Sequence, residues 1–309
     1  MTHDENNVFP PDPAPSSDSS RHVDPATREL LPAELPPLDR GHSVVLENPQ
    51  LPETSVTEDI LVPWGWTDLV LFLILAVAGF ILVSLLTGLG LAMSGVNVHR
   101  IQKSPHDINL LSIFIQVLVD LGLLAYLALQ MRLRFHSPFW RTIGWRKPDT
   151  GRIPPGVFYF GLILSGFFLS MIVSLGSSLF PPKKNLPIET LFQDRYTTLL
   201  FMLVAVLLAP LVEETIFRGY IYPVVARSFG KGWGILATGT LFGLLHASQL
   251  WGGWSQIALL VFVGMVLTFA RAVSRTVVAS FVIHTSYNSV QVIGLLIATH
   301  GLRHLPGAP

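Results

Sequence analysis

The sequence predicts an all-α fold: a polytopic bundle of about seven or eight transmembrane helices behind a disordered N-terminal tail. Half of the 309 residues are hydrophobic and 13% are charged, a balance typical of membrane proteins rather than of soluble domains. Several apolar runs reach the roughly 20 residues that a helix needs to cross a bilayer core of about 30 Å. The 309 residues include no cysteine, which excludes disulfides, thiolate metal sites and a cysteine nucleophile.

Residues 1–60 form the predicted tail. They hold 12 of the 20 acidic residues but three of the 20 basic ones, a net charge of −9, whereas the remaining chain carries +9. Eight prolines between positions 10 and 37 interrupt any helical run, so we expect an acidic, proline-rich, disordered segment. Because the first 25 residues do not resemble a signal peptide, we expect the first membrane helix to act as an uncleaved signal anchor.

Residues 61–195 form a predicted N-terminal transmembrane region. Its three predicted spans cover residues 69–93, 108–131 and 156–180. The loop 132–152 is the most basic in the chain and carries aromatic residues, which predicts a short helix in the headgroups on the cytoplasmic side. Asp120 interrupts the second span; we interpret it either as a hydrogen-bonding residue inside the bundle or as part of a polar cavity wall.

Residues 196–300 form the predicted catalytic region. Four further spans are expected, over residues 196–227, 233–249, 255–270 and 276–298. The distribution of Lys and Arg between the loops favours a cytoplasmic N-terminus, and we expect a multi-pass protein of the plasma (inner) membrane. Arg271 and Arg275, between the last two spans, are interpreted as positive-inside anchors.

Three charged residues, Glu213, Glu214 and Arg218, lie within the predicted span 196–227. Each charge costs roughly 2.5 to 3.5 kcal/mol at a helix centre, so a cluster of three indicates a function. Positions i and i+4 share a helix face, so Glu214 and Arg218 can pair. Glu213 is rotated about 100° from Glu214 and can face a cavity instead. Pro210, just before this cluster, predicts a kink.

Two further polar sets occupy later spans, namely Phe242-x-x-x-His246 and His284-x-x-x-Asn288. Within each set the two residues share one helix face. If the chain turns near residues 230–232, Glu213 and His246 both lie roughly 23 to 26 Å from that turn and therefore at one depth. The next turn, at residues 271–275, brings His284 within reach of the same level.

Close helix packing is also predicted in this region. Gly239 and Gly243 lie four residues apart on the span that carries His246. Small residues at such spacing let a neighbouring membrane helix approach closely. We therefore expect a helix to pack tightly against this face.

A carboxylate with two imidazoles in a low-dielectric pocket suits the activation of water. Glu213 would be the general base, one histidine would orient the water or share its proton, and a His/Asn pair would donate hydrogen bonds to a developing oxyanion. Glu213, His246 and His284 could equally hold a metal ion such as zinc with an open position for water. The spacing does not choose between the two. The alternative that these residues only join helices is disfavoured by their compatible depths.

The three sets, in this order on successive apolar helices, resemble the CPBP intramembrane protease family, which contains the type II CAAX prenyl endopeptidases and bacteriocin-processing and immunity relatives. The resemblance covers about residues 196–298. It implies that Glu213 and His246 activate the attacking water and that His284 and Asn288 stabilise the oxyanion. It further implies that Glu214 and Arg218 support the site, and we add Phe242 to the supporting residues.

The resemblance implies an intramembrane endopeptidase acting on a membrane-associated protein or peptide, prenylated of the CAAX type or bacteriocin-like, in a cavity open to the cytoplasm. Members are called metalloproteases, and a metal-free, glutamate-dependent mechanism has also been argued, so the cofactor stays open between zinc and none. Two alternatives are a catalytically silent membrane scaffold or immunity protein and an ion-coupled transporter. The expected partners are this substrate and the lipid bilayer, with no nucleic acid.

Overall fold

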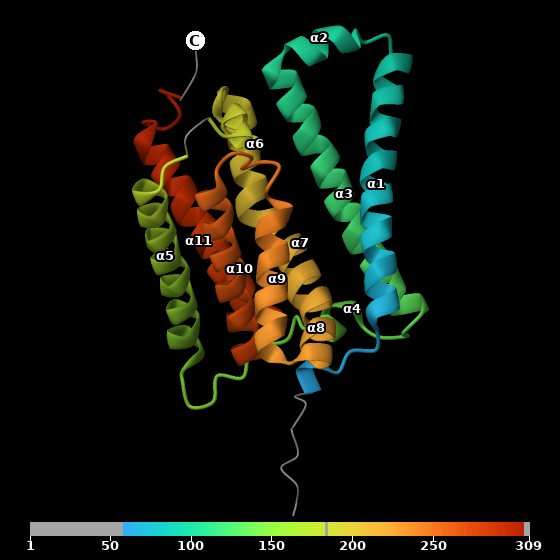
Figure 1. The fold of residues 1–309 in the computed structure, drawn as a ribbon, viewed down its shortest axis with the longest axis vertical. Coiled ribbons are helices and arrows are strands. Elements are labelled where there is room, and N and C mark those ends of the chain that lie inside the picture. The colour runs from blue at the N-terminus through green and yellow to red at the C-terminus, as the bar shows by residue number, and fades with distance from the viewer. Residues whose placement is uncertain (1–57, 183–184, 306–309) are drawn as a thin grey trace, which may run out of the picture. The chain divides into compact units, whose positions relative to one another are not determined.

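The computed structural model describes residues 58–182 and 185–305 (Figure 1). Over these residues the secondary structure is helical, without a strand, which confirms the predicted all-α class. The prediction of a disordered tail falls largely on residues 1–57, outside the described part. Its last three residues, Glu58–Ile60, form a short 3-10 helix, η2.

The N-terminal region contains two long helices that form an open hairpin, close together at one end and apart at the other, and a third long helix that packs elsewhere (Figure 1). These elements are α1 (Trp66–Met93), α2 (Val98–Lys103), α3 (Pro105–Leu133), α4 (Phe139–Thr142) and α5 (Pro155–Leu179). Helix α3 begins where it does because Ser104 caps it and Pro105 occupies its first turn, where no backbone N–H is needed. Helix α4 confirms the short helix predicted within the loop 132–152.

The C-terminal region is built around one long interrupted helix and three further helices. Its elements are η3 (Pro187–Phe192), α6 (Arg195–Leu203), η4 (Val204–Leu208), α7 (Ala209–Glu214), η5 (Thr215–Ile221), α8 (Tyr222–Phe229), α9 (Lys231–Leu245), α10 (Trp254–Ser274) and α11 (Val277–Ala298). The turn after α8 is made by Gly230, at φ 86°, as the sequence predicts. Arg275, at φ 58°, makes the turn between α10 and α11.

Six helices of the described chain are long and apolar enough to cross a membrane, where the sequence predicts seven. The difference is α9, which has 15 residues and a length of about 22 Å. The predicted span 233–249 is shorter than expected because the chain leaves the helix at His246 and turns through residues 246–252. The segment Arg195–Phe229 is a single span of 35 residues, so the expected long helix is confirmed.

Glycines let the backbones of α9 and α10 come into contact, which confirms the close approach predicted at Gly239 and Gly243. A Cβ on Gly239 would lie 2.6 Å from the backbone nitrogen of Met265, and one on Gly243 would lie 2.6 Å from that of Val261. Gly264 faces back, because a Cβ there would meet the carbonyl oxygen of Gly239 at 2.6 Å. No larger residue fits these positions without a shift of one helix.

A buried network ties the α1–α3 hairpin to the long helix. Trp64 donates from Nε1 to the carbonyl oxygen of Tyr220 at 2.9 Å, and the two rings stack with centroids 5.1 Å apart. Tyr220 donates through its hydroxyl to Gln130 at 2.9 Å. Asp68, in the first turn of α1, pairs with Arg134 after the end of α3 at 2.7 Å. The start of α1 and the end of α3 are therefore held against residue 220.

Arg271, interpreted from the sequence as a positive-inside anchor, is buried within the protein. Its side chain is 1% exposed and pairs with Asp59 at 2.8 Å, and it also donates to the Asp59 carbonyl oxygen at 3.1 Å. An acid 212 positions away in the sequence therefore satisfies this charge inside the protein.

Candidate active site

Glu213 lies on α7, a six-residue α-helical stretch between two π-helical segments, η4 and η5. At the end of η4 the backbone N–H of Ala209 bonds to the carbonyl oxygen of Val204, five residues back rather than four. Such turns are rare in proteins, and those that occur are frequently found at functional sites. The irregularity that the sequence predicts at Pro210 therefore takes the form of a π-helical turn next to it.

Asn288 on α11 compensates for a hydrogen bond that Pro210 cannot make. If the five-residue register of Ala209 continued, residue 210 would donate to the carbonyl oxygen of Ala205, but proline has no N–H. The Nδ2 atom of Asn288 donates to this oxygen at 2.7 Å. In the described chain no hydrogen bond joins Asn288 to Glu213, His246 or His284, so the structure attaches it to the helix backbone rather than to these side chains.

Glu214, Arg218 and His284 form a buried group. Arg218 pairs through Nη1 with Glu214 Oε1 at 2.8 Å, and both side chains are fully buried. The same Oε1 contacts His284 Nδ1 at 2.9 Å. The predicted pair of Glu214 and Arg218 is thus present, and it reaches one of the two predicted histidines.

Arg218 completes its hydrogen bonding on α10. It donates from Nη2 to the carbonyl oxygen of Gly264 at 2.9 Å and from Nε to Thr268 Oγ1 at 3.2 Å. A buried guanidinium is tolerated only when it is paired and hydrogen-bonded, and here all three of its nitrogens have partners. The spacing of Gly264 and Thr268 in an apolar run carries no signal by which sequence reasoning could have found them.

Phe242 lies at the centre of these groups. The guanidinium carbon of Arg218 is 4.6 Å from its ring centroid, within the range of a cation–π contact. The rings of His246 and His284 lie 5.0 and 5.8 Å from it. The ring, 2% exposed, packs between the charged group and both imidazoles.

Glu213 is flanked by the two histidines. One carboxylate oxygen lies 3.8 Å from His246 Nε2, and the other lies 3.7 Å from His284 Nε2. The side chains of Glu213 and His246 are 21% and 20% exposed, whereas that of His284 is 4% exposed. The depth argument from helix lengths is therefore confirmed, because residues from α7, the end of α9 and α11 converge on one carboxylate.

Hydrogen bonds orient both imidazole rings. His246 Nδ1 lies 2.9 Å from the carbonyl oxygen of Phe242, and because a carbonyl only accepts, Nδ1 carries the proton. In the neutral ring Nε2 then presents a lone pair toward Glu213. His284 is held by Glu214 in the same way, with Nε2 turned to Glu213. The side chains thus offer one carboxylate and two ring nitrogens to a shared point.

Two more polar groups lie close to this site. Trp145, from the loop after α4, donates from Nε1 to Thr215 Oγ1 at 3.0 Å, next to Glu214 in the chain. Asp120 on α3 is buried and accepts a hydrogen bond from Gln116 at 2.8 Å, which supplies the partner that the sequence left unnamed. The contact of Trp145 with Thr215 could not be read from spacing, because the two residues are 70 positions apart. Gln116 and Asp120, by contrast, are four positions apart and share a helix face.

The metal alternative rests on Glu213, His246 and His284. The Glu213 carboxylate lies 3.7 Å from His284 Nε2 and 3.8 Å from His246 Nε2. In the described residues no group of three His, Asp or Glu side chains was found that could hold a metal ion. The chemistry below therefore takes no step through a metal.

The protein is therefore an integral membrane protein in which carboxylates and imidazoles meet inside a helical bundle. Residues 195–290, about a third of this chain, match the family described as type II CAAX prenyl endopeptidase, Rce1-like. The match confirms the resemblance and its extent. No curated protein and no solved structure matches the chain.

Proposed function

We propose that the protein is an intramembrane endopeptidase that hydrolyses a peptide bond of a membrane-associated substrate, with Glu213 as the general base. The observation that carries the proposal is the position of the Glu213 carboxylate between the Nε2 atoms of His246 and His284, at 3.8 and 3.7 Å. The match of residues 195–290 to an endopeptidase family supports the same reaction class. A general base placed this way contributes about 10² to 10⁴-fold to the rate.

In the proposed reaction, Glu213 takes one proton from a water molecule while the water oxygen forms a bond to the carbonyl carbon of the scissile peptide. His246 accepts the second O–H of this water at its Nε2 lone pair, which orients the attack. Glu213 then delivers its proton to the amide nitrogen as the C–N bond breaks. The products are a new carboxyl terminus and a free amine.

His284 is proposed to stabilise the tetrahedral intermediate. With protons on both ring nitrogens, its Nδ1–H donates to Glu214 and its Nε2–H is available to the oxyanion. Arg218 holds the Glu214 carboxylate in place for this role. Asn288 would reach the oxyanion only with the N–H that does not bond to Ala205. Glu214, Arg218 and Phe242 position these groups without touching the substrate.

The substrate class and the membrane orientation are part of the proposal. The matched family favours a substrate with a prenylated CAAX-type C-terminus, and a bacteriocin-like peptide is the alternative. We infer a plasma (inner) membrane location with a cytoplasmic N-terminus from the basic loop 132–152. The metalloprotease class stays open, since no step of the mechanism depends on a metal.

The test is cleavage of a farnesylated peptide with a CAAX-type end by the full chain in liposomes, compared with the same peptide without the lipid. We expect Glu213→Gln to lower the cleavage rate at least about 100-fold. Glu189→Gln is the matched control, since Glu189 only accepts a hydrogen bond from the backbone of Leu186 in η3. Membrane proteomics of cells with wild-type protein or Glu213→Gln would then identify accumulated natural precursors.

Wild-type turnover in Glu213→Gln would refute the role of Glu213. A biological function that persists while Glu213→Gln blocks all cleavage would instead favour a membrane scaffold. Cleavage of the unprenylated peptide alone would overturn the CAAX-type substrate but leave the endopeptidase standing.

A further inference from the structure

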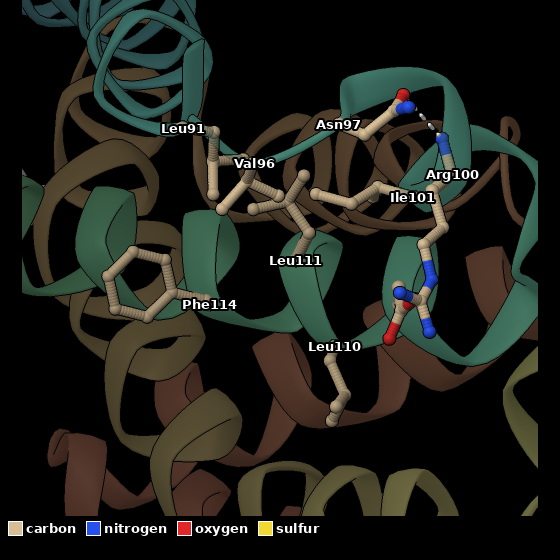
Figure 2. A pocket seen from close by; sticks show the side chains of 9 residues that line it. Leu91, Val96, Asn97, Arg100, Ile101, Leu110, Leu111 and Phe114 are labelled. Carbon is tan, nitrogen blue, oxygen red and sulfur yellow. Dashed lines mark hydrogen bonds between the residues drawn. The ribbon is translucent and has the colours of Figure 1, made fainter. Parts of the chain in front are cut away.

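A hollow of about 510 Å³ opens where α1, α2 and α3 meet, away from the residues of the candidate active site (Figure 2). This volume lies within the range of about 300 to 1,000 Å³ that is usual for ligand sites. Its wall is mostly apolar, made by Leu91, Val96, Ile101, Leu110, Leu111 and Phe114. Figure 2 shows Leu91, Val96, Ile101 and Leu111 turned toward one another. We call it the α1–α3 hollow.

A second hollow of about 360 Å³ continues the first and differs from it in chemistry. The two share Asn97 and Arg100, and the second adds His99, Lys103 and Ser104. The α1–α3 hollow contains one acidic residue, Asp107, and the second contains none. In the described part of the chain neither Arg100 nor Lys103 forms an ion pair. The polar hollow therefore carries an excess of positive charge.

The apolar hollow lies beside the membrane spans, and the polar hollow lies beyond their ends. Leu91 lies in the last turn of the span α1, and Leu110, Leu111 and Phe114 lie within the span α3. Arg100 and Lys103 lie on α2, which connects these spans outside their apolar stretches. Only 11% of the α1 span and 17% of the α3 span are buried within the protein, so lipid chains have access to this hairpin.

We propose that the two hollows together bind one anionic phospholipid, with the headgroup at Arg100 and Lys103 and an acyl chain along the apolar wall. An amphiphile with a negative head matches the change from cationic to apolar lining along the direction of the spans. A zwitterionic lipid fills the apolar wall equally well but leaves the positive charge uncompensated. The opposite charges of the two cations and an anionic headgroup attract each other, and the attraction is stronger at a protein surface than in bulk water. The site is separate from the proposed protease function.

The test is native mass spectrometry of the full chain in detergent, titrated with phosphatidylglycerol or with phosphatidylcholine of identical acyl chains. We expect at least fivefold tighter retention of phosphatidylglycerol, since one basic residue near a charged surface contributes about fivefold. Arg100→Ala/Lys103→Ala should reduce phosphatidylglycerol to the level of phosphatidylcholine. Arg100→Lys, which keeps the charge, should retain most of the preference. Leu111→Trp, which fills the apolar wall, should weaken both lipids.

The matched control is Arg195→Ala/Arg303→Ala. Arg195 begins α6 and Arg303 follows α11, and these ends of the two helices lie at the same end of the bundle as α2 (Figure 1). Both cations are exposed and lie outside both hollows. The control should keep the preference, and thermal unfolding in the same detergent should be unchanged in all variants.

Three results would overturn the proposal. They are equal retention of the two lipids by the wild type, an undiminished preference in Arg100→Ala/Lys103→Ala, and an equal loss in the control pair. Displacement of the lipid by glycerol phosphate at matched concentration would assign the site to a free phosphate instead.

Discussion

The side-chain amide of Asn288 donates to the carbonyl oxygen of Ala205 at 2.7 Å, where Pro210 leaves that oxygen without a backbone donor. This bond joins α11, which carries His284, to the helix that carries Glu213. It gives Asn288 a positioning role that differs from the oxyanion role implied by the family resemblance. The two roles make different predictions.

Asn288→Ala should lower the free energy of unfolding by about 0.5 to 1.5 kcal/mol, because it leaves the partly buried carbonyl oxygen of Ala205 without a donor. Pro210→Ala returns an N–H to the helix, so it should recover most of this loss in the Asn288→Ala background. The measurement is unfolding of the four proteins of the double-mutant cycle in detergent, with the coupling energy as the readout.

The same cycle measured by peptide cleavage separates the two roles of Asn288. If Asn288 only positions the helix, Pro210→Ala restores activity together with stability. If Asn288 stabilises the oxyanion, stability returns but activity does not. Additive effects on stability would refute the link to Pro210 altogether.

Glu213 and Glu214 should differ in stability as well as in chemistry. Glu214→Gln removes the carboxylate that pairs with the buried Arg218, and the uncompensated charge should cost about 3 to 5 kcal/mol. Glu213→Gln should change the free energy of unfolding by less than about 0.5 kcal/mol, since Glu213 makes no contact shorter than 3.7 Å with either histidine. Unfolding by sodium dodecyl sulfate measures both. Similar losses in the two variants would contradict the division between them.

Gly239→Ala should destabilise the contact between α9 and α10. Its Cβ would lie 2.6 Å from the backbone nitrogen of Met265, and such overpacking costs about 1 to 3 kcal/mol. Gly232→Ala on the same helix is the control, because no heavy atom lies within 4 Å of the added Cβ. There the change should be neutral or stabilising by up to about 1 kcal/mol. Thermal unfolding of both variants decides, and equal stabilities would show that the helices can separate without cost.

Asp194 should make the junction of α3 and α6 sensitive to acid. Burial alone would raise its pKa, but the contacts with Thr197 and His106 outweigh burial and hold the pKa below its ordinary value of 3.8. Its carboxylate accepts from the Thr197 backbone at 2.9 Å and lies 3.0 Å from His106 Nδ1. Because the folded-state pKa is the lower one, the stabilisation is present above pH 3.8 and is lost as the pH falls through the folded-state value.

Two substitutions at Asp194 separate its charge from its capping of α6. Asp194→Asn keeps a capping side chain, so it should remove the pH dependence at little cost near neutral pH. Asp194→Ala should lose about 1 kcal/mol at neutral pH. The measurement is the unfolding free energy between pH 3 and pH 7. A wild-type acid transition that persists in Asp194→Asn would assign it to another group.

The local parts of the fold and site follow from the sequence. The spans are predictable because length and apolar content are properties of one segment, and six of the seven expected spans are confirmed. The pairing of Glu214 with Arg218 is predictable because residues four apart share a helix face. The convergence of His246 and His284 on Glu213 is also predictable, since rise per residue sets depth on either side of a turn.

The sequence alone thus determined the helical class, the helix that carries the charge cluster, and the depth at which its partners lie. Only the tertiary structure decided that His284 bonds to Glu214, that Asn288 bonds to Ala205 and that Arg271 is buried against Asp59. Those contacts depend on how each helix is rotated and on the π-helical turns around α7. A change of one residue in register rotates every later side chain by about 100°, and composition and spacing do not encode that change.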